Sequence, residues 1–296
     1  MIVEKYNLRE DGSAYFVTYI QEPSAELPNS YARPAVVVCP GGGYCCCSDR
    51  EAEPVALEFL TKGFNAFVVR YSVGENAAYP NSLVDLSSAM RIIRENAERW
   101  HVKKDQIAVC GFSAGGHLVA SLATLWNDPE VQEKAGCQGQ ENKPDGVLLL
   151  YPVISMGKFT HQQTRNMLLQ GYDHKREEMV RKLSCELQVG PHTPPAFIAH
   201  TYADNAVPVE NALMFASALA AADRPFDLHI FQEGFHGLSL ANQNTFCNPA
   251  LLNWDFYNWV ELSCNWLIHL FGIDGIPEMA PHSWNYDSRA KAISPI

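Results

Sequence analysis

Short strand-like runs alternate along this chain with longer segments in which apolar residues recur every three or four positions. Runs of the first kind are typical of strands buried in a parallel sheet, and those of the second of helices that cover it. The runs predicted to be strands are residues 35–39, 65–71, 106–110, 146–151, 196–201 and 227–231. The segments predicted to be helices are residues 55–62, 83–100, 114–126, 210–221 and 255–270. This alternation predicts an α/β fold with a mostly parallel central sheet and right-handed crossovers.

Three segments lie outside this alternation. Residues 14–20 alternate and are rich in Tyr, Phe, Val and Thr, which predicts an antiparallel strand ahead of the parallel ones. Residues 155–195 are polar and irregular, with a helical patch near 175–183, and we expect an insertion of the kind that covers a site. Residues 275–296 hold three prolines and few apolar residues, so we expect a surface tail. We therefore predict one domain over residues 1–296 rather than two.

Charge and cysteine content narrow the function classes. The chain has 33 acidic and 22 basic residues and a formal charge of −11, which argues against binding to nucleic acid or to an anionic membrane. It has neither an apolar run of about 18 residues, as a membrane span requires, nor a secretory signal. Nine cysteines without a CxxC pair, three of them adjacent at Cys45, Cys46 and Cys47, are interpreted as free thiols. We expect a cytoplasmic protein without a bound metal.

A candidate nucleophile lies in the motif Gly111-Phe112-Ser113-Ala114-Gly115, which matches G-x-S-x-G. The motif directly follows the predicted strand 106–110 and opens the predicted helix 114–126, and this strand–turn–helix setting is the one a nucleophile elbow requires. Small residues two positions before and after the serine let strand and helix approach. Ser113 is therefore the predicted nucleophile, held at the positive end of a helix.

A glycine-rich loop, Pro40-Gly41-Gly42-Gly43-Tyr44, follows the predicted strand 35–39. Such loops also cradle phosphates, but this one lacks both the GK[ST] of a P-loop and the GxGxxG spacing of a dinucleotide site. We interpret it as an oxyanion loop, in which Gly42 and Gly43 donate with the amide of Ala114 while Gly41 forms the turn. Tyr44 is a candidate substrate-binding residue because its backbone belongs to this loop. Residues 48–51 match a capping box that opens the next helix.

The candidate acid and base follow two later strands. Asp204 lies beyond the strand 196–201, and His236 lies between Gly234 and Gly237 just beyond the strand 227–231. The chain order Ser113, Asp204, His236 is the one expected for a hydrolase of this architecture. Other histidines have simpler interpretations: His117, His200 and His229 are predicted to be structural. His161 lies in the insertion and could reach the pocket, but we predict that it lies on the surface.

Taken together, residues 36–44, 48–56, 111–118, 194–208 and 234–237 resemble the α/β-hydrolase esterases. More narrowly, they are similar to bacterial acetyl-xylan and related carbohydrate esterases, which carry P-G-G-G-Y in place of the H-G-G-G of lipases. The resemblance covers roughly residues 30 to 271. It implies a Ser–His–Asp hydrolase of small acyl esters that uses no cofactor.

The hypothesis that follows is a serine esterase that deacetylates xylo-oligosaccharides or related sugars, with a small acylated substrate as its partner. Two alternatives remain open. One is an amidase or peptidase with the same residues, although peptidases of this fold usually bring a large extra domain. The other is a non-catalytic binding protein that kept the fold, against which the intact Ser113, Asp204 and His236 argue.

Overall fold

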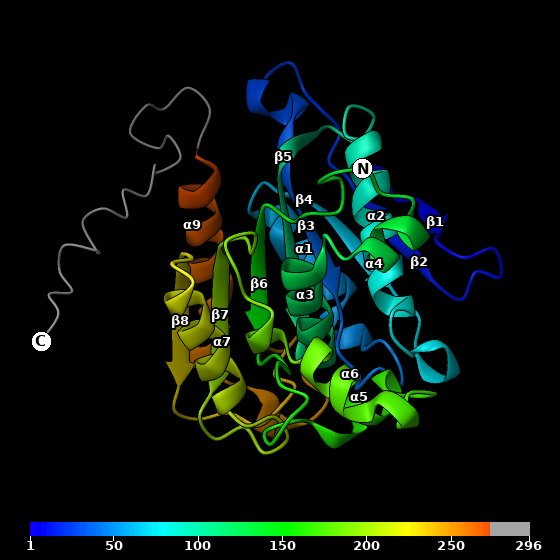
Figure 1. Ribbon diagram of the computed structural model, residues 1–296. Coiled ribbons are helices and arrows are strands. Elements are labelled where there is room, and N and C mark those ends of the chain that lie inside the picture. Colours follow the sequence, from blue (N-terminus) through cyan, green and yellow to red (C-terminus); the bar gives the residue numbers. More distant parts are fainter. Residues whose placement is uncertain (273–296) are drawn as a thin grey trace, which may run out of the picture.

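The computed structural model describes residues 1–272, and their strands form one eight-stranded sheet (Figure 1). The strands are β1 Lys5–Asn7, β2 Tyr15–Tyr19, β3 Arg33–Cys39, β4 Asn65–Arg70, β5 Val102–Phe112, β6 Gly146–Leu150, β7 Ala196–Thr201 and β8 Phe226–Phe231. Their order across the sheet is β1-β2-β4-β3-β5-β6-β7-β8. From β4 to β8 all neighbours are parallel, whereas β1 and β2 pair antiparallel. The predicted α/β class and the antiparallel lead-in strand are thus confirmed.

Helices cover both faces of the sheet. The longer ones are α1 Glu53–Thr61, α2 Asn81–Glu95, α3 Ser113–Leu125, α7 Glu210–Ala221 and α9 Trp259–Phe271. The shorter ones are α4 Pro129–Ala135, α5 Gln162–Leu168, α6 Arg176–Leu183 and α8 Trp254–Tyr257. Because successive strand residues point to opposite faces, Val37 packs in a cluster with α2, α3 and α7, whereas Val36 and Val38 pack with α1 and α9.

One helical prediction needs correction, and one helix was not predicted. The helix expected over residues 255–270 is interrupted at Asn258 and forms α8 and α9. Helix α4 was not predicted, although Asp128 caps it by accepting from the amides of Glu130 and Val131 and Gly136 ends it in a left-handed conformation. Both signals stand in the sequence, but the helix has only seven residues and shows little periodicity.

The expected insertion at residues 155–195 contains α5 and α6, which lie together at the edge toward which β7 and β8 run (Figure 1). The helical patch predicted near 175–183 corresponds to α6, and α5 was not predicted. A fully buried side chain, Asn211 of α7, anchors the start of the insertion. Its Oδ1 accepts from the amides of Ile154 and Ser155, and its Nδ2 donates to the carbonyl of Phe159. The tail predicted at 275–296 lies outside the described residues.

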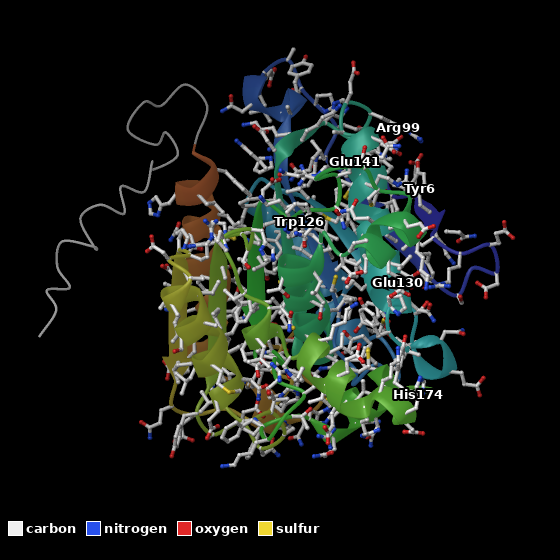
Figure 2. All side chains as sticks on the ribbon, in the orientation of Figure 1. Tyr6, Arg99, Trp126, Glu130, Glu141 and His174 are labelled. Carbon is white, nitrogen blue, oxygen red and sulfur yellow. The ribbon has the colours of Figure 1, made fainter. Side chains whose placement is uncertain are left out.

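The first strand is fastened at the far edge of the sheet by mixed polar and aromatic contacts. Figure 2 shows Arg99 beside Tyr6, and its guanidinium lies 5.8 Å from the ring centroid. Arg99 also donates to both carboxylate oxygens of Glu4 at 3.0 Å. No helix within residues 1–272 is long and apolar enough to cross a bilayer.

Candidate active site

The turn between β5 and α3 places Ser113 in an unusual backbone conformation. Its φ is +52°, a value that costs energy for any residue with a side chain and that strand–turn–helix elbows impose. The flanking glycines are sterically required. A Cβ at Gly111 would lie 2.3 Å from the carbonyl oxygen of Gly115, and one at Gly115 would lie 2.2 Å from that of Cys39. The predicted strand–turn–helix setting is therefore present.

Ser113, His236 and Asp204, predicted separately from three parts of the chain, meet at the carboxyl edge of the sheet. Ser113 Oγ lies 2.7 Å from His236 Nε2, and His236 Nδ1 lies 2.7 Å from Asp204 Oδ2. They converge because β5, β7 and β8 are parallel, so that their carboxyl ends share one edge. A neutral imidazole that donates from Nδ1 to the carboxylate leaves Nε2 free to accept the serine proton.

The carboxylate of Asp204 is held in its ionised form. Burial alone raises its pKa, but the hydrogen bond from His236, the charge of that ring and the amides of Val207 and Ala206 outweigh it, so the pKa lies below its ordinary value. The two amides donate to Oδ1 at 2.8 and 2.9 Å, while Oδ2 faces the histidine. Each carboxylate oxygen therefore has its own hydrogen-bond partners, and rotation of the carboxylate would break the contacts of both oxygens.

The glycine-rich loop after β3 lies directly against Ser113. A Cβ at Gly41 would lie 2.9 Å from the Cβ of Ser113. Gly42 and Gly43 have φ values of +127° and +63°, a region that favours glycine. The Gly41 amide donates to Glu51 Oε2 at 2.8 Å, so it is engaged in the turn. In the described part of the chain, the amides of Gly42 and Gly43 have no such partner, which leaves them available to a ligand.

One prediction near this loop was wrong. Ser48 makes no side-chain cap, and the Glu51 carboxylate binds Gly41 and Tyr151 instead of its own helix start, so the expected capping box is absent. Tyr44, a candidate because its backbone belongs to the loop, has a side chain that is only 1% exposed, so that any contact with substrate would come from its backbone. Its φ of +60° turns the ring inward, where Tyr44 Oη lies 3.0 Å from His117 Nδ1.

His117 is a structural histidine, as predicted. It is buried, and its Nε2 donates to the carbonyl of Leu183 at 2.8 Å, which leaves Nδ1 to accept from Tyr44. Burial lowers the pKa of His117 to about 4, so its ring is neutral at physiological pH. The ring thereby joins the glycine-rich loop to the carboxyl end of α6 in the insertion.

The surface role expected for His161 is only partly met, since this residue is half-buried. Burial, followed by the charge of His236, lowers its pKa. Its Nδ1 lies 3.0 Å from Thr164 Oγ1.

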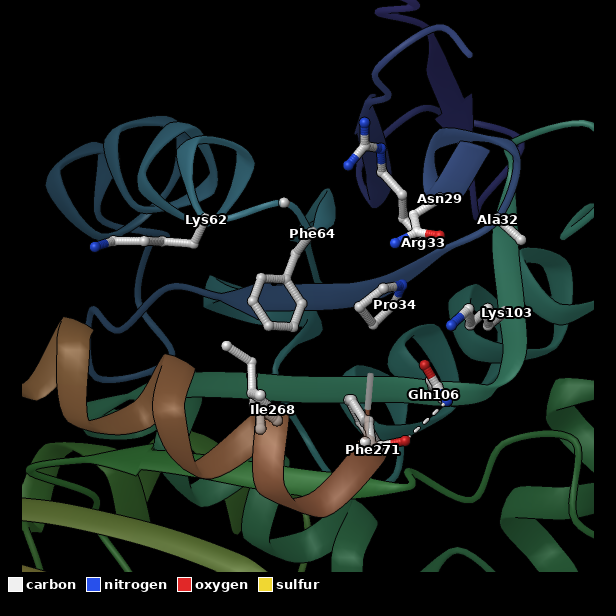
Figure 3. Close-up of a pocket in the computed structure, with 13 residues that line it drawn as sticks. Asn29, Ala32, Arg33, Pro34, Lys62, Phe64, Lys103, Gln106, Ile268 and Phe271 are labelled. Carbon is white, nitrogen blue, oxygen red and sulfur yellow. Dashed lines mark hydrogen bonds between the residues drawn. The ribbon is translucent and has the colours of Figure 1, made fainter. Parts of the chain in front are cut away.

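A cavity of about 250 Å³ lies at the opposite, amino-terminal end of the sheet (Figure 3). Arg33, Lys62 and Lys103 are among its charged lining residues, and Phe64 and Phe271 are among its apolar ones. None of the predicted site residues belongs to it. The nine cysteines are free thiols, and among residues 1–272 no group of three or more His, Cys, Asp or Glu side chains is arranged to hold a metal ion.

The fold and the sheet topology define the class: this is an α/β-hydrolase. The profile of the BD-FAE family matches residues 23–219, and the chain belongs to this family. The predicted resemblance to the α/β-hydrolase esterases is thereby confirmed.

Two curated relatives carry carbohydrate-related names. One is "Endo-1,4-beta-xylanase B" of Butyrivibrio fibrisolvens, 40% identical over 236 residues, which cover 74% of this chain and 36% of the relative. The other is "Acetylxylan esterase" of Xylanibacter ruminicola, 30% identical over 260 residues, with 86% and 49% covered. The chain thus spans between a third and a half of the length of these relatives, so their names alone do not fix the activity of the whole protein.

Solved structures agree with this grouping over their whole length. The acetyl ester-xyloside bifunctional hydrolase from Caldicellulosiruptor lactoaceticus is 32% identical, with a TM-score of 0.75 and 89% and 94% of the two chains covered. The carboxylesterase Cest-2923 from Lactobacillus plantarum WCFS1 is 29% identical, with a TM-score of 0.79 and 90% and 97% covered.

Proposed function

We propose that this protein is a serine esterase in which Ser113, His236 and Asp204 form the catalytic triad. The observation that carries the proposal is the continuous pair of 2.7 Å contacts that joins Ser113 Oγ to His236 and His236 to Asp204. Two details support it further: Ser113 sits in the strained elbow, and the lowered pKa of Asp204 keeps its carboxylate ionised beside the ring.

The reaction proceeds in two half-reactions. Ser113 Oγ attacks the ester carbonyl carbon while His236 Nε2 takes the hydroxyl proton, and the carbonyl oxygen becomes an oxyanion. The amides of Gly42, Gly43 and Ala114 bind this oxyanion. The intermediate collapses when His236 protonates the leaving alcohol, which leaves an acyl group on Ser113. Water, deprotonated by His236, then attacks the acyl carbon and releases the acid.

For the substrate we propose short acyl esters, with acetylated xylo-oligosaccharides or related sugars as the natural class. The names of the xylanase, acetylxylan esterase and acetyl ester-xyloside hydrolase relatives support this choice. The negative charge of the chain suits a neutral substrate. The nine free thiols suit a reducing compartment, so we propose that hydrolysis takes place in the cytoplasm.

The nucleophile is tested by replacing Ser113 with Ala. Removal of a triad serine lowers kcat by about 10⁴ to 10⁶-fold in hydrolases of this kind. We expect a loss of this size on an activated acetyl ester, and loss of covalent labelling by a fluorophosphonate probe. The exposed Ser13→Ala variant serves as the control and keeps both properties. Unimpaired turnover by folded Ser113→Ala would rule out the proposed nucleophile.

A substrate panel tests the acyl and sugar specificity. Acetylated xylo-oligosaccharides are compared with simple acetyl, butyryl and longer-chain esters at equal leaving-group reactivity. We expect kcat/KM to be highest on the acetylated oligosaccharide. Equal or better rates on long acyl chains would remove the carbohydrate part of the proposal while leaving the triad in place.

A further inference from the structure

Glu51 is a carboxylate that the proposed reaction does not use, although it lies next to the parts that do. It belongs to the 3-10 helix Asp49–Glu51, which follows the glycine-rich loop, and it is only 3% exposed. Its two oxygens contact different partners: Oε2 accepts from the amide of Gly41 at 2.8 Å, and Oε1 accepts from the hydroxyl of Tyr151 at 2.7 Å. A buried carboxylate is costly unless its hydrogen bonds are satisfied, and here both oxygens are.

The first contact sets the position of the glycine-rich loop. The Gly41 amide donates to Glu51, and this hydrogen bond fixes the loop in a position where Gly41 packs against the side chain of Ser113. The Gly41 carbonyl is held by the amide of Ser48 at 2.9 Å. The next two amides of the loop, those of Gly42 and Gly43, are thereby oriented as a consequence of the contact made by Glu51.

The second contact reaches the loop that carries His236. Tyr151 Oη, which donates to Glu51, accepts from the amide of Ser239 at 2.7 Å. The ring of Tyr151 meets the ring of His236 edge to face, with centroids 5.1 Å apart and planes at 73°. Burial, followed by the charge of Glu51, raises the pKa of Tyr151 well above its ordinary value, so the phenol keeps the proton that it donates.

The neighbouring Arg50 strengthens the same connection. Its guanidinium donates to the carbonyls of Gly237 and Thr245, and its own carbonyl accepts from Ser239 Oγ at 2.6 Å. Arg50 thus contacts the histidine loop on both sides of Leu238. The loop after β3 and the loop after β8 are far apart in sequence, and they are joined directly by Arg50 and, through Tyr151, by Glu51.

We propose that Glu51 is a positioning residue. It keeps the oxyanion-binding amides and His236 in register around Ser113, so that the oxyanion is bound while His236 takes the serine proton. This inference rests on the proposed esterase function and adds to it a residue that does not contact substrate. The chemistry requires a carboxylate, since Gly41 N–H and Tyr151 O–H both donate and both need an acceptor. A glutamine in the same place would offer one acceptor and one donor and would leave one neighbour unsatisfied.

Glu51→Gln is tested by measuring kcat, KM and the Ki of a short-chain trifluoromethyl ketone. In the ketone adduct, Ser113 Oγ bonds to the carbonyl carbon, His236 takes the serine proton, and the former carbonyl oxygen becomes an oxyanion. Concentrations are normalised to active sites by fluorophosphonate titration. We expect kcat to fall by about 10- to 100-fold, less than the loss of an oxyanion donor itself, and KM to change less than about threefold. The Ki for the ketone should rise by the same factor as kcat/KM falls.

Two further variants separate positioning from stability. Asp85→Asn alters another buried carboxylate, one that accepts from the amide of Ser72 and from Arg9 and has no hydrogen bond to the glycine-rich loop or the histidine loop. It should lower thermal stability and leave kcat and the Ki per active site unchanged. Tyr151→Phe keeps the ring against His236 but removes the link to Ser239, and it should lower kcat in part. The double variant Glu51→Gln/Tyr151→Phe should be no worse than Glu51→Gln alone, because the two residues form one connection.

The outcomes distinguish this inference from the function on which it rests. Wild-type protein without ester turnover and without labelling of Ser113 would overturn the proposed function. An active wild type, together with an unchanged kcat and Ki in Glu51→Gln or in Tyr151→Phe, would overturn the positioning role alone. Tyr151→Phe provides this test even where Glu51→Gln does not yield folded protein.

Discussion

The turn that carries Ser113 and the loop that carries His236 lie at the same edge of the sheet, but they are built in different ways. Residues 111–115 are all buried, and the turn is fixed by backbone contacts that only glycine permits at Gly111 and Gly115. Residues 232–237 are exposed or half-buried and have no regular secondary structure. Side chains from distant parts of the chain hold them in place.

The contacts of the histidine loop show how it is held. Thr201 Oγ1 donates to the carbonyl of Gly234 at 2.8 Å, Asn253 Nδ2 donates to that of Glu233 at 2.8 Å, and the amide of His236 donates to Asn205 Oδ1 at 3.2 Å. Each contact is individually modest. The elbow is therefore a property of five adjacent residues, whereas the histidine position is the sum of many weak long-range contacts.

The largest effect on the histidine side should come from Asp204→Asn. The backbone amides of Ala206 and Val207 still need the one remaining oxygen, so the NH2 group of the new amide would face Nδ1. The imidazole would then carry its proton on Nε2, which could no longer accept from Ser113. We expect kcat for an acetyl ester to fall by about 10³- to 10⁴-fold, while the elbow and the fold remain intact. Asp227→Asn, an exposed change on β8, is the control and should leave kcat unchanged. A comparable loss in both variants would contradict a specific role for Asp204.

The elbow should be most sensitive to a side chain that clashes with its backbone. In Gly115→Ala the new methyl group would lie 2.2 Å from the carbonyl oxygen of Cys39 and 2.4 Å from that of Pro40, and neither can move without distorting β3. We expect a loss of about 3 kcal/mol or more in the free energy of unfolding, measured by urea denaturation.

Gly157→Ala is the matched control for that change. Its nearest neighbour is Ser155 Oγ at 3.2 Å, a side-chain atom that can shift. The control substitution should therefore lower the free energy of unfolding by about 1 kcal/mol or less. Equal costs at the two positions would mean that the close contact between α3 and β3 does not determine the elbow.

The contact of His117 with the glycine-rich loop and the insertion should make the free energy of unfolding depend on pH. His117 titrates near its ordinary value of 6.5 when unfolded but at about 4 when folded, so between these values the unfolded chain binds more protons. Stability should therefore fall as the pH is lowered from 6.5 to 4, by about 3 kcal/mol from this residue.

Urea denaturation at pH 7 and pH 4.5 checks this sign. His117→Gln, which can still accept from Tyr44 and donate to Leu183, should lose less stability over this interval than the wild type does. His174→Gln, an exposed change, should follow the wild type. Identical slopes for wild type and His117→Gln would show that His117 is not held neutral by burial.

The smallest effect should come from one contact of the histidine loop. Thr201→Val keeps the shape of a buried side chain but leaves the carbonyl of Gly234 without its donor. We expect about 1–2 kcal/mol of lost stability and a few-fold fall in kcat. Thr61→Val removes a similar hydroxyl-to-carbonyl bond on an exposed helix end and should cost less. Thermal melts and kcat measured on both variants decide whether burial makes the difference.

These differences explain what could be predicted from the sequence. The elbow was predictable because its residues are contiguous, and Asp204 and His236 because each follows a recognisable strand. The Glu51–Tyr151 contact was not predictable, because it joins residues 100 positions apart. The direction of the Tyr44 side chain was also missed, since it depends on the left-handed backbone at that residue and on the acceptor provided by His117.

One contact at the base of the insertion has a consequence for enzyme design. Asn211 belongs to α7 of the sheet framework, and its single amide group holds the backbone of Ile154, Ser155 and Phe159. The amide of Cys185 returns to the carbonyl of Ile154 at 3.1 Å, so the two ends of the segment between them lie side by side. A replacement for residues 160–183 would have to keep these ends and also supply the buried core contacts of Leu168, Met179 and Leu183.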